Sequence, residues 1–209
     1  MRDALVILAG YALGSIPFAY LITKLATGKD IRLEGGGNVG TRNVMHVAGR
    51  LPGFCKLLLD MARGALACQL GRNWSSDPVP FHLTGFALML GHRFPVWLRF
   101  RGGKGLAAMG GFLLRIWPYS VLGASVILVL AQTVIDSFDL TVGIASIGML
   151  IMSLIEGNDL SGLLFIVSLL LLVGAKKRID LPYEGAVRAG EIPDWPLGPT
   201  PEKRSHRTT

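Results

Sequence analysis

The amino-acid sequence predicts an all-α fold, a polytopic transmembrane helical bundle with about seven spans. Hydrophobic residues make up 51% of the 209 residues and charged residues only 17%, whereas a soluble domain carries about 25% charged residues. Residues 5–23 and 116–135 each contain no charged side chain. A helix needs about 20 consecutive apolar residues to cross the hydrocarbon core of a bilayer. We therefore expect most of the chain to be surrounded by lipid.

Apolar segments follow one another along most of the sequence. The candidate spans are 5–23, 52–71, 79–98, 106–114, 116–135, 140–155 and 160–175. The first is expected to be retained rather than cleaved as a signal peptide, because its charged flank is only Arg2 and Asp3 and no small-residue cleavage site follows it. The segment 106–114 is too short to cross a bilayer unless it tilts or extends, so five or six spans are alternatives to seven.

Positive charge is concentrated between the apolar segments, which predicts their side of the membrane. Residues 24–56 hold six Lys and Arg against two acidic residues, and residues 93–104 hold four with no acidic residue. Lys176, Lys177 and Arg178 follow the last apolar segment. Because basic loops remain in the cytoplasm, we expect the amino terminus outside and the carboxyl terminus in the cytoplasm. The net charge of +7 lies in such loops, so nucleic acid is not an expected partner.

Two regions are expected along the chain, a transmembrane domain over residues 1–178 and a polar cytoplasmic tail over residues 179–209. The tail contains five prolines and no apolar period that would support a packed element. The two cysteines, Cys55 and Cys68, lie in an apolar stretch, so no disulfide framework is expected. The sequence contains no metal-ligand spacing and no Gly-x-Ser-x-Gly elbow, and neither a metal nor a cofactor is predicted.

A glycine-rich segment lies in the basic connection after the first span. Three of its glycines satisfy the pattern Gly-x-Gly-x-x-Gly, but a dinucleotide fold would need a strand before them and a βαβ unit around them. What remains is an anion-binding nest of backbone N–H groups, with a flexible linker as the alternative. The predicted phosphate-binding residues are Gly35, Gly36, Gly37, Gly40, Arg42, Asn43 and His46, and Asn38 is a candidate catalytic residue.

A second segment, residues 91–105, combines glycines with aromatic and basic residues. Lys104 lies between Gly103 and Gly105, as expected of a lysine that binds phosphate, and it is a candidate catalytic residue. Gly102 and Gly103 are predicted to help in binding the phosphate. The segment is not a Walker A loop, because the residue after Lys104 is neither Ser nor Thr.

The remaining polar residues of this segment have two interpretations each. His92 can act as a catalytic general base near neutral pH, and a structural hydrogen-bonding role is the alternative. Arg93, Arg99 and Arg101 alternate with aromatic residues. They are predicted to form an interfacial anchor, with rings at headgroup level and cations reaching towards water.

Asp60 and Arg63 are charged residues three positions apart within an otherwise apolar segment. An unpaired charge at the centre of a bilayer costs about 2.5 to 3.5 kcal/mol on insertion scales. We therefore expect the two side chains to pair with each other or to line the polar site.

The two glycine-rich segments together resemble the PlsY family, the bacterial acyl-phosphate:glycerol-3-phosphate acyltransferases, over roughly residues 10 to 110. The first family motif reads Gly-Ser-Gly-Asn-x-Gly-x-Thr-Asn, and the second reads Gly-His-x-Phe-Pro followed by Phe-Lys-Gly-Gly-Lys. The residues that match in order and spacing are Gly14, Ser15, Ile16, Pro17, Phe18, Asp30, Ile31, Arg32, Gly35, Gly37, Asn38, Gly40, Asn43, Gly91, His92, Phe94, Pro95, Phe100, Gly102, Gly103 and Lys104.

The resemblance implies a membrane acyltransferase of phospholipid biosynthesis. It would move a fatty acyl group from acyl phosphate to the 1-hydroxyl of glycerol 3-phosphate and give lysophosphatidic acid. It also implies a multi-pass protein of the bacterial plasma (inner) membrane, surrounded by membrane lipid, with the site facing the cytoplasm. The backbone of residues 35–40 with Asn38 and Lys104 would hold one phosphate, Arg42 or His46 would hold the other, and the acyl chain would lie between spans.

The sequence departs from the family pattern at several positions. Gly36, Arg42, His46 and Arg63 stand where the motifs have Ser, Thr, Arg and Lys, and the carboxyl-terminal motif is not recognisable around residues 178–191. These departures favour an alternative, a non-catalytic family homologue that binds phospholipid or acyl phosphate. An anion transporter is a third class, disfavoured because no inverted repeat is visible.

Overall fold

The computed structural model describes residues 2–75 and 77–191, and every regular element in this part of the chain is helical. The elements are α1 (Arg2–Ser15), α2 (Phe18–Thr27), η1 (Ile31–Leu33), α3 (Thr41–Ala48), α4 (Arg50–Trp74), α5 (Pro78–Arg93), η2 (Val96–Leu98), α6 (Leu106–Leu114), α7 (Pro118–Gln132), α8 (Phe138–Ile155) and α9 (Leu160–Arg188), where η marks a short 3₁₀ helix. The predicted all-α fold is confirmed.

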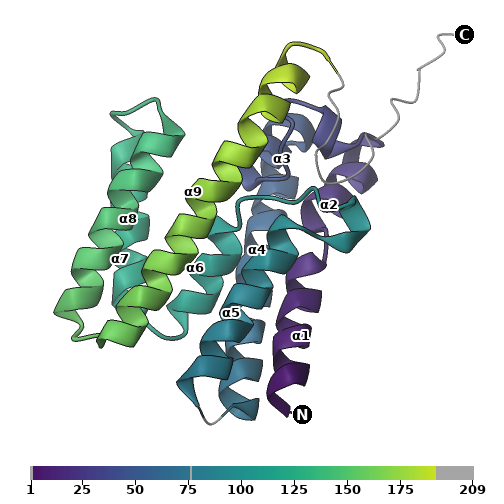
Figure 1. The fold of residues 1–209 in the computed structure, drawn as a ribbon. Coiled ribbons are helices and arrows are strands. Elements are labelled where there is room, and N and C mark those ends of the chain that lie inside the picture. Colours follow the sequence, from purple (N-terminus) through teal and green to yellow (C-terminus); the bar gives the residue numbers. More distant parts are fainter. Residues whose placement is uncertain (1, 76, 192–209) are drawn as a thin grey trace, which may run out of the picture.

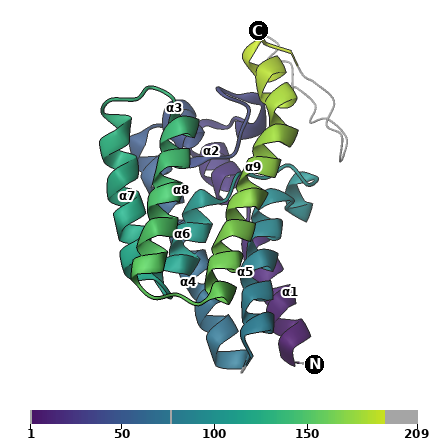
Figure 2. The ribbon, with the colours of Figure 1, turned by 60° about the vertical axis from the view of Figure 1, so that its left-hand side comes forward.

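The long helices run side by side, and both glycine-rich connections lie at one end of the bundle (Figure 1). α1 runs from the amino terminus towards this end, where α2, α3 and the last turns of α9 gather. The same arrangement is visible after the 60° turn of Figure 2. We call this end the loop end and define it as residues 28–49, 94–105 and 179–191.

Pro17 divides the first predicted span into two helices. Proline has no backbone N–H, and its ring disfavours helical conformation in the residue before it. α1 accordingly ends at Ser15 and α2 begins at Phe18. The break leaves carbonyl oxygens at the end of α1 without helical partners, and the side chain of Arg63 on α4 donates hydrogen bonds to them.

Glycines allow the backbones of neighbouring helices to approach closely. Between α1 and α5, a side chain added at Gly91 would collide with the carbonyl oxygen of Tyr11, and one added at Gly14 would collide with that of Leu88. α4 faces the backbone of α6 in the same way at Gly64. Small residues at such contacts are typical of helix pairs in membranes, where close van der Waals packing replaces the hydrophobic effect.

The core lies between α4, α5, α6 and α9. Its most buried apolar side chains are Ala67, Cys68, Leu88, Met89, Ala108, Phe112, Leu113, Phe165, Ile166 and Leu169. α7 and α8 form a hairpin that stands beside α9 (Figure 2). An apolar groove separates α8 from α9.

Three helical stretches in the described residues are long and apolar enough to cross a membrane. They are Arg2–Thr27, Phe138–Ile155 and Leu160–Arg188. α4 has 25 residues but carries buried charges, while α5, α6 and α7 have only 16, 9 and 15 residues. The number of seven spans and the outside position of the amino terminus therefore stay predictions.

α9 extends past the predicted end of the transmembrane domain at residue 178. The expected absence of a packed element in the tail is wrong for residues 180–188, which continue the helix. Asp180 and Tyr183 on these turns are buried, because they pack against the loops instead of facing water. No sequence period reveals such a contact. The rest of the predicted tail, residues 192–209, lies outside the described residues, and the division of the chain into two regions stays a prediction.

The Gly91→Val substitution tests the close contact between α1 and α5. The added side chain meets the backbone of Tyr11, so we expect a loss of about 1–3 kcal/mol of stability from overpacking. Gly110→Val is the matched control, because no atom of the described residues lies within 4 Å of a Cβ added there. Thermal unfolding of the purified proteins in detergent measures the difference. Equal melting temperatures for the two variants would contradict the close contact.

Candidate active site

A buried group of charges lies on α4 below the glycine-rich loop. It consists of Lys56, Asp60 and Arg63, which we call the α4 triad. Asp60 is 0% exposed. Its carboxylate lies 2.6 Å from Lys56 Nζ and 2.6 Å from Arg63 Nη2. The expected pairing of Asp60 with Arg63 is confirmed, and Lys56 joins it as a second cation.

Arg63 pairs with the end of α1. Its Nη1 donates hydrogen bonds to the carbonyl oxygens of Gly14 at 2.8 Å and Ile16 at 2.7 Å. These carbonyls lack helical partners because Pro17 stops the helix. Arg63 therefore satisfies the break between α1 and α2 and fixes the direction in which α2 leaves towards the loop end.

His92, at the end of α5, lies against the α4 triad. It is only 7% exposed, and its Nδ1 contacts Arg63 Nη2. A guanidinium can only donate, so Nδ1 is the acceptor and the ring proton is on Nε2. That nitrogen faces the second loop, because a Cβ added at Gly103 would lie 2.7 Å from it. His92 thus offers an N–H donor towards the glycines that precede Lys104.

Asn43 holds the glycine-rich loop in shape. Its Nδ2 lies 2.7 Å from the carbonyl oxygen of Asn38 and 3.0 Å from that of Glu34, and its Oδ1 accepts a hydrogen bond from Gly36 N at 2.8 Å. Asn43 is buried at the centre of the loop. Its amide is therefore occupied by the loop itself.

Part of the predicted nest of glycine N–H groups is also used inside the loop. Besides Gly36, the N–H of Gly37 bonds to the carbonyl of Glu34 at 3.0 Å, and the N–H of Gly40 bonds to Asn38 Oδ1 at 3.0 Å. α3 starts directly after the loop and has no side-chain cap. Its first N–H groups have no acceptor within the helix. The donors left for an anion therefore belong to the first turn of α3.

The second loop folds back onto the end of α5. Gly102 N bonds to Arg93 O at 2.9 Å, and Gly103 N bonds to His92 O at 3.1 Å. Arg93 Nη2 donates to Lys104 O at 2.7 Å. A side chain at Gly102 would collide with the carbonyl of His92, which explains the glycine at this position. The fold-back places Lys104 at the mouth of the loop.

Lys104 meets the last turns of α9. Its Nζ lies 3.6 Å from Glu184 Oε1, and the other oxygen of Glu184 lies 3.4 Å from Arg188 Nη2. Arg188 in turn lies 3.9 Å from a Cβ position built on Gly36. The carboxyl-terminal part of α9 thus brings one acid and one further cation between the two glycine-rich loops.

Tyr183 joins three segments that are distant in sequence. Its hydroxyl donates to Arg32 O at 3.0 Å and accepts from Arg101 Nη1 at 2.7 Å. Arg32 also donates from Nη1 to Leu98 O at 3.1 Å. The first loop, the second loop and α9 therefore share one hydrogen-bonded junction. Burial lowers the pKa of the Arg101 guanidinium below its ordinary value.

The predicted interfacial anchor is wrong for two of its three arginines. Arg93 is 1% exposed and Arg101 is 4% exposed, because both pair with groups inside the loop end. Arg99 is exposed, and so are the rings of Trp97 and Phe100. Alternation of rings and cations could not distinguish arginines that point inward from those that point outward.

The structure brings the predicted site residues of both loops to the same end. Val39 lies 3.3 Å from a Cβ position built on Gly103, so the loops touch. His46 lies beside Gly35, at 3.2 Å from its built Cβ. Arg42 points elsewhere, with its guanidinium 5.6 Å from the ring centre of Phe138.

Sequence reasoning missed three charged residues of this region. They are Lys56, Glu184 and Arg188. Lys56 had a usable signal, because it stands four residues before Asp60 on the same helix face. Glu184 and Arg188 lie in a stretch that was interpreted as an unpacked tail, and only the extension of α9 brings them to the site.

Comparison with known proteins decides the family. The sequence model of a family described as glycerol-3-phosphate acyltransferase matches residues 4–181. The chain belongs to the glycerol-3-phosphate acyltransferase family. It is similar to glycerol-3-phosphate acyltransferase of Myxococcus xanthus, with 45% identity over 130 residues, 62% of this chain and 67% of the relative. It is 36% identical to glycerol-3-phosphate acyltransferase 1 of Dehalococcoides mccartyi over 180 residues, 83% of this chain and 86% of the relative.

Solved structures agree with this family. The chain resembles the crystal structure of PlsY, an integral membrane glycerol 3-phosphate acyltransferase, in its glycerol 3-phosphate form. The TM-score is 0.79 at 26% identity, and the match covers 91% of this chain and 94% of PlsY. The lysophosphatidic acid form has the same fold, with a TM-score of 0.76 at 24% identity. The resemblance to the PlsY family is confirmed, and the chain is an integral membrane protein with several spans.

Neutralising the centre of the α4 triad should destabilise the protein. Asp60→Asn leaves two buried cations without a counter-charge, and breaking a buried ion pair costs about 3–5 kcal/mol. Asp77→Asn is the control, because Asp77 is exposed and its side chain does not cap α5. Chemical denaturation in mild detergent compares the two variants. A loss no larger than that of the control would contradict the assigned role of Asp60.

Proposed function

We propose that the chain transfers a fatty acyl group from acyl phosphate to the 1-hydroxyl of glycerol 3-phosphate at the loop end, and releases lysophosphatidic acid and phosphate. One observation carries the assignment of the site. The glycine-rich loop and the Lys104 loop touch each other above a buried, net positive group of side chains, in a chain whose family match extends over residues 4–181.

Both substrates of this reaction carry a phosphate, so the site needs cations more than a nucleophile. Lys104 on the second loop and Arg188 on the last turn of α9 share the carboxylate of Glu184. A phosphate that enters between Lys104 and Arg188 takes over part of their contact with Glu184. The two fixed cations then stabilise the negative charge of the reacting phosphate. His46 lies beside Gly35 of the glycine-rich loop and can hold the second phosphate, whereas Arg42 is directed towards Phe138.

The chemistry requires positioning and charge stabilisation. The 1-hydroxyl oxygen attacks the acyl carbon, the bond from that carbon to the phosphate oxygen breaks, and the hydroxyl proton passes to a phosphate oxygen. Phosphate is a good leaving group, so orientation supplies much of the rate. Lys104 binds the leaving phosphate, and the Nε2–H group of His92 donates a hydrogen bond to the bound substrate. Asn38 and Asn43 hold the glycine-rich loop in the conformation that binds phosphate.

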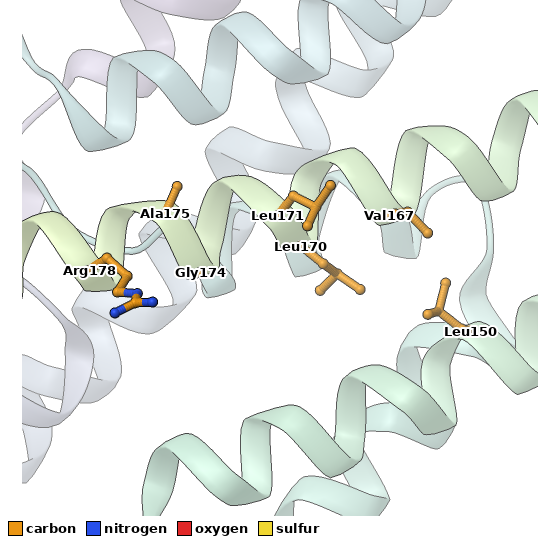
Figure 3. Close-up of a pocket in the computed structure, with 7 residues that line it drawn as sticks. All are labelled: Leu150, Val167, Leu170, Leu171, Gly174, Ala175 and Arg178. Carbon is orange, nitrogen blue, oxygen red and sulfur yellow. The ribbon is translucent and has the colours of Figure 1, made fainter.

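The acyl chain has a suitable groove between α8 and α9 (Figure 3). The groove has a volume of about 550 Å³ and is lined by Leu150, Val167, Leu170, Leu171, Gly174, Ala175 and Arg178. This volume lies within the range of ordinary ligand pockets. Its walls are apolar, and Arg178 places a cation towards the loop end of α9. We propose that the fatty chain of the donor occupies this groove.

The side of the membrane follows from charge. Residues 24–56 and 93–104 carry most of the basic residues of the connections, and both contribute to the loop end. The positive-inside tendency therefore supports a site that faces the cytoplasm of a bacterial inner membrane, where the water-soluble glycerol 3-phosphate is available.

Lys104→Ala should abolish most of the activity. Loss of one charge that stabilises the transition state costs about 100-fold to 1000-fold in rate. The assay supplies palmitoyl phosphate and radiolabelled glycerol 3-phosphate to the purified protein in bilayers and measures lysophosphatidic acid. Lys24→Ala is the control, because Lys24 is exposed and, within the described part of the chain, bonds to the carbonyl of Gly28 at the end of its own helix. Binding of both substrates without turnover by the unchanged chain would instead support a non-catalytic homologue.

Gly174→Leu tests the acyl groove. Among residues 2–75 and 77–191, nothing lies within 4 Å of a Cβ added at Gly174, so the variant should fold, but the larger side chain fills part of the groove. We expect the preference for palmitoyl over octanoyl phosphate, measured as the ratio of kcat/KM, to fall about tenfold. Gly143→Leu is the matched control, an exposed glycine of α8 with equal space around it. An unchanged ratio would place the acyl chain elsewhere.

A further inference from the structure

Lys56 is a buried cation with no role in the proposed transfer step. It is 3% exposed and lies on the first half of α4, directly below the start of α3. Its Nζ lies 3.3 Å from Thr41 Oγ1 and 2.6 Å from the carboxylate of Asp60. These two contacts hold the ammonium group in one place beside the end of the glycine-rich loop.

The charges around Lys56 do not balance. Asp60 is the one carboxylate within ion-pair distance of Lys56 or Arg63 among the described residues, and it serves both cations. His92 is the next neighbour and presents no negative charge. The α4 triad therefore has a net charge of +1 while all three side chains are buried. An uncompensated buried charge is costly, so an anion that binds beside it gains a strong interaction.

A small cavity lies where that anion would be. It has a volume of about 20 Å³. Gly14 and residues 16–20 at the break between α1 and α2 form one side, and Lys56, Arg63 and His92, with Val39 of the first loop and Gly102 of the second, form the rest. A cavity of this size holds about one water molecule. A phosphoryl oxygen is of similar size, so one oxygen of a phosphate fits in the cavity while the rest of the group lies between the two loops.

We propose that Lys56 is a further substrate-binding residue, which contacts an oxygen of a substrate phosphate in the cavity between the two loops. The proposal rests on the proposed function, because it assigns a phosphate ligand to the same site. Thr41 and Asp60 fix the position of the Lys56 ammonium group before binding, so the Lys56 side chain loses little conformational entropy when the phosphate binds. The phosphate then supplies the negative charge that the α4 triad lacks.

This role makes a distinctive prediction for the ligand-free protein. Lys56→Met removes the surplus charge and leaves Asp60 paired with Arg63, so the variant should melt at the same temperature as the unchanged protein or higher. A residue that only braced α4 against α3 would show the opposite result, a lower melting temperature with unchanged ligand affinity. Stability and affinity together therefore separate the two roles.

The experiment measures binding to the purified full chain in detergent by isothermal titration calorimetry. The probes are glycerol 3-phosphate and a non-hydrolysable acyl phosphonate. We expect Lys56→Met to weaken the binding of at least one probe about tenfold or more, as for loss of a hydrogen bond to a charged group. Lys56→Arg keeps the charge and should recover most of the affinity. Lys29→Met, a half-exposed lysine at the same end, should leave affinity unchanged.

The two probes identify the ligand of Lys56, and their results separate this proposal from the proposed reaction. Weaker binding of glycerol 3-phosphate alone assigns Lys56 to the acceptor, and weaker binding of the phosphonate alone assigns it to the donor. Equal affinities of Lys56→Met and the unchanged chain for both probes would overturn the role of Lys56, even if lysophosphatidic acid is formed. If the unchanged chain binds both probes but forms no product, the proposed function fails while the binding role of Lys56 is still measured.

Discussion

The carboxylate of Asp60 is the interaction on which the loop end depends. It is completely buried and holds two cations that point in different directions. Arg63 reaches the carbonyl oxygens exposed by the break before Pro17 and contacts His92. Lys56 reaches Thr41 at the start of α3. One carboxylate thus fixes the end of α1, the end of α5 and the beginning of α3 relative to α4. A buried carboxylate needs at least one cation beside it, and Asp60 has two.

A second junction completes the site from the other side. Tyr183 connects α9 to Arg32 in the first loop and to Arg101 in the second. Through it, the last turns of α9 bring Glu184 to Lys104. The two glycine-rich loops consequently lie between two rigid supports, α4 below and α9 beside them. Loops held in this way can keep their charges in fixed positions without order imposed by the ligand, which is the condition for electrostatic stabilisation of a reacting phosphate.

The departures from the family motifs have a physical interpretation in this arrangement. The glycine-rich loop lacks the motif serine at Gly36 and the motif arginine at His46, yet the region is not poor in donors or cations. Lys56 and Arg188 both lie close to the loop, and the first turn of α3 has free N–H groups. What matters for a phosphate is the number and position of positive charges, and different residues on different helices can supply them.

The sequence by itself determined the helical fold, the membrane surroundings and the family. Apolar length decides the first two, and the ordered matches in both glycine-rich segments decide the third. The sequence also placed Lys104 and Asn38 in the two loops that meet. It could not determine that Arg93 and Arg101 point inward, that Asn43 and several glycine N–H groups are used by the loop, or that α9 continues to Arg188. Those outcomes depend on contacts between segments far apart in the chain, and periodicity reports only the neighbours along one helix. The tertiary structure alone decided which charges are buried together, because burial of an ion is favourable only when partners from other elements surround it.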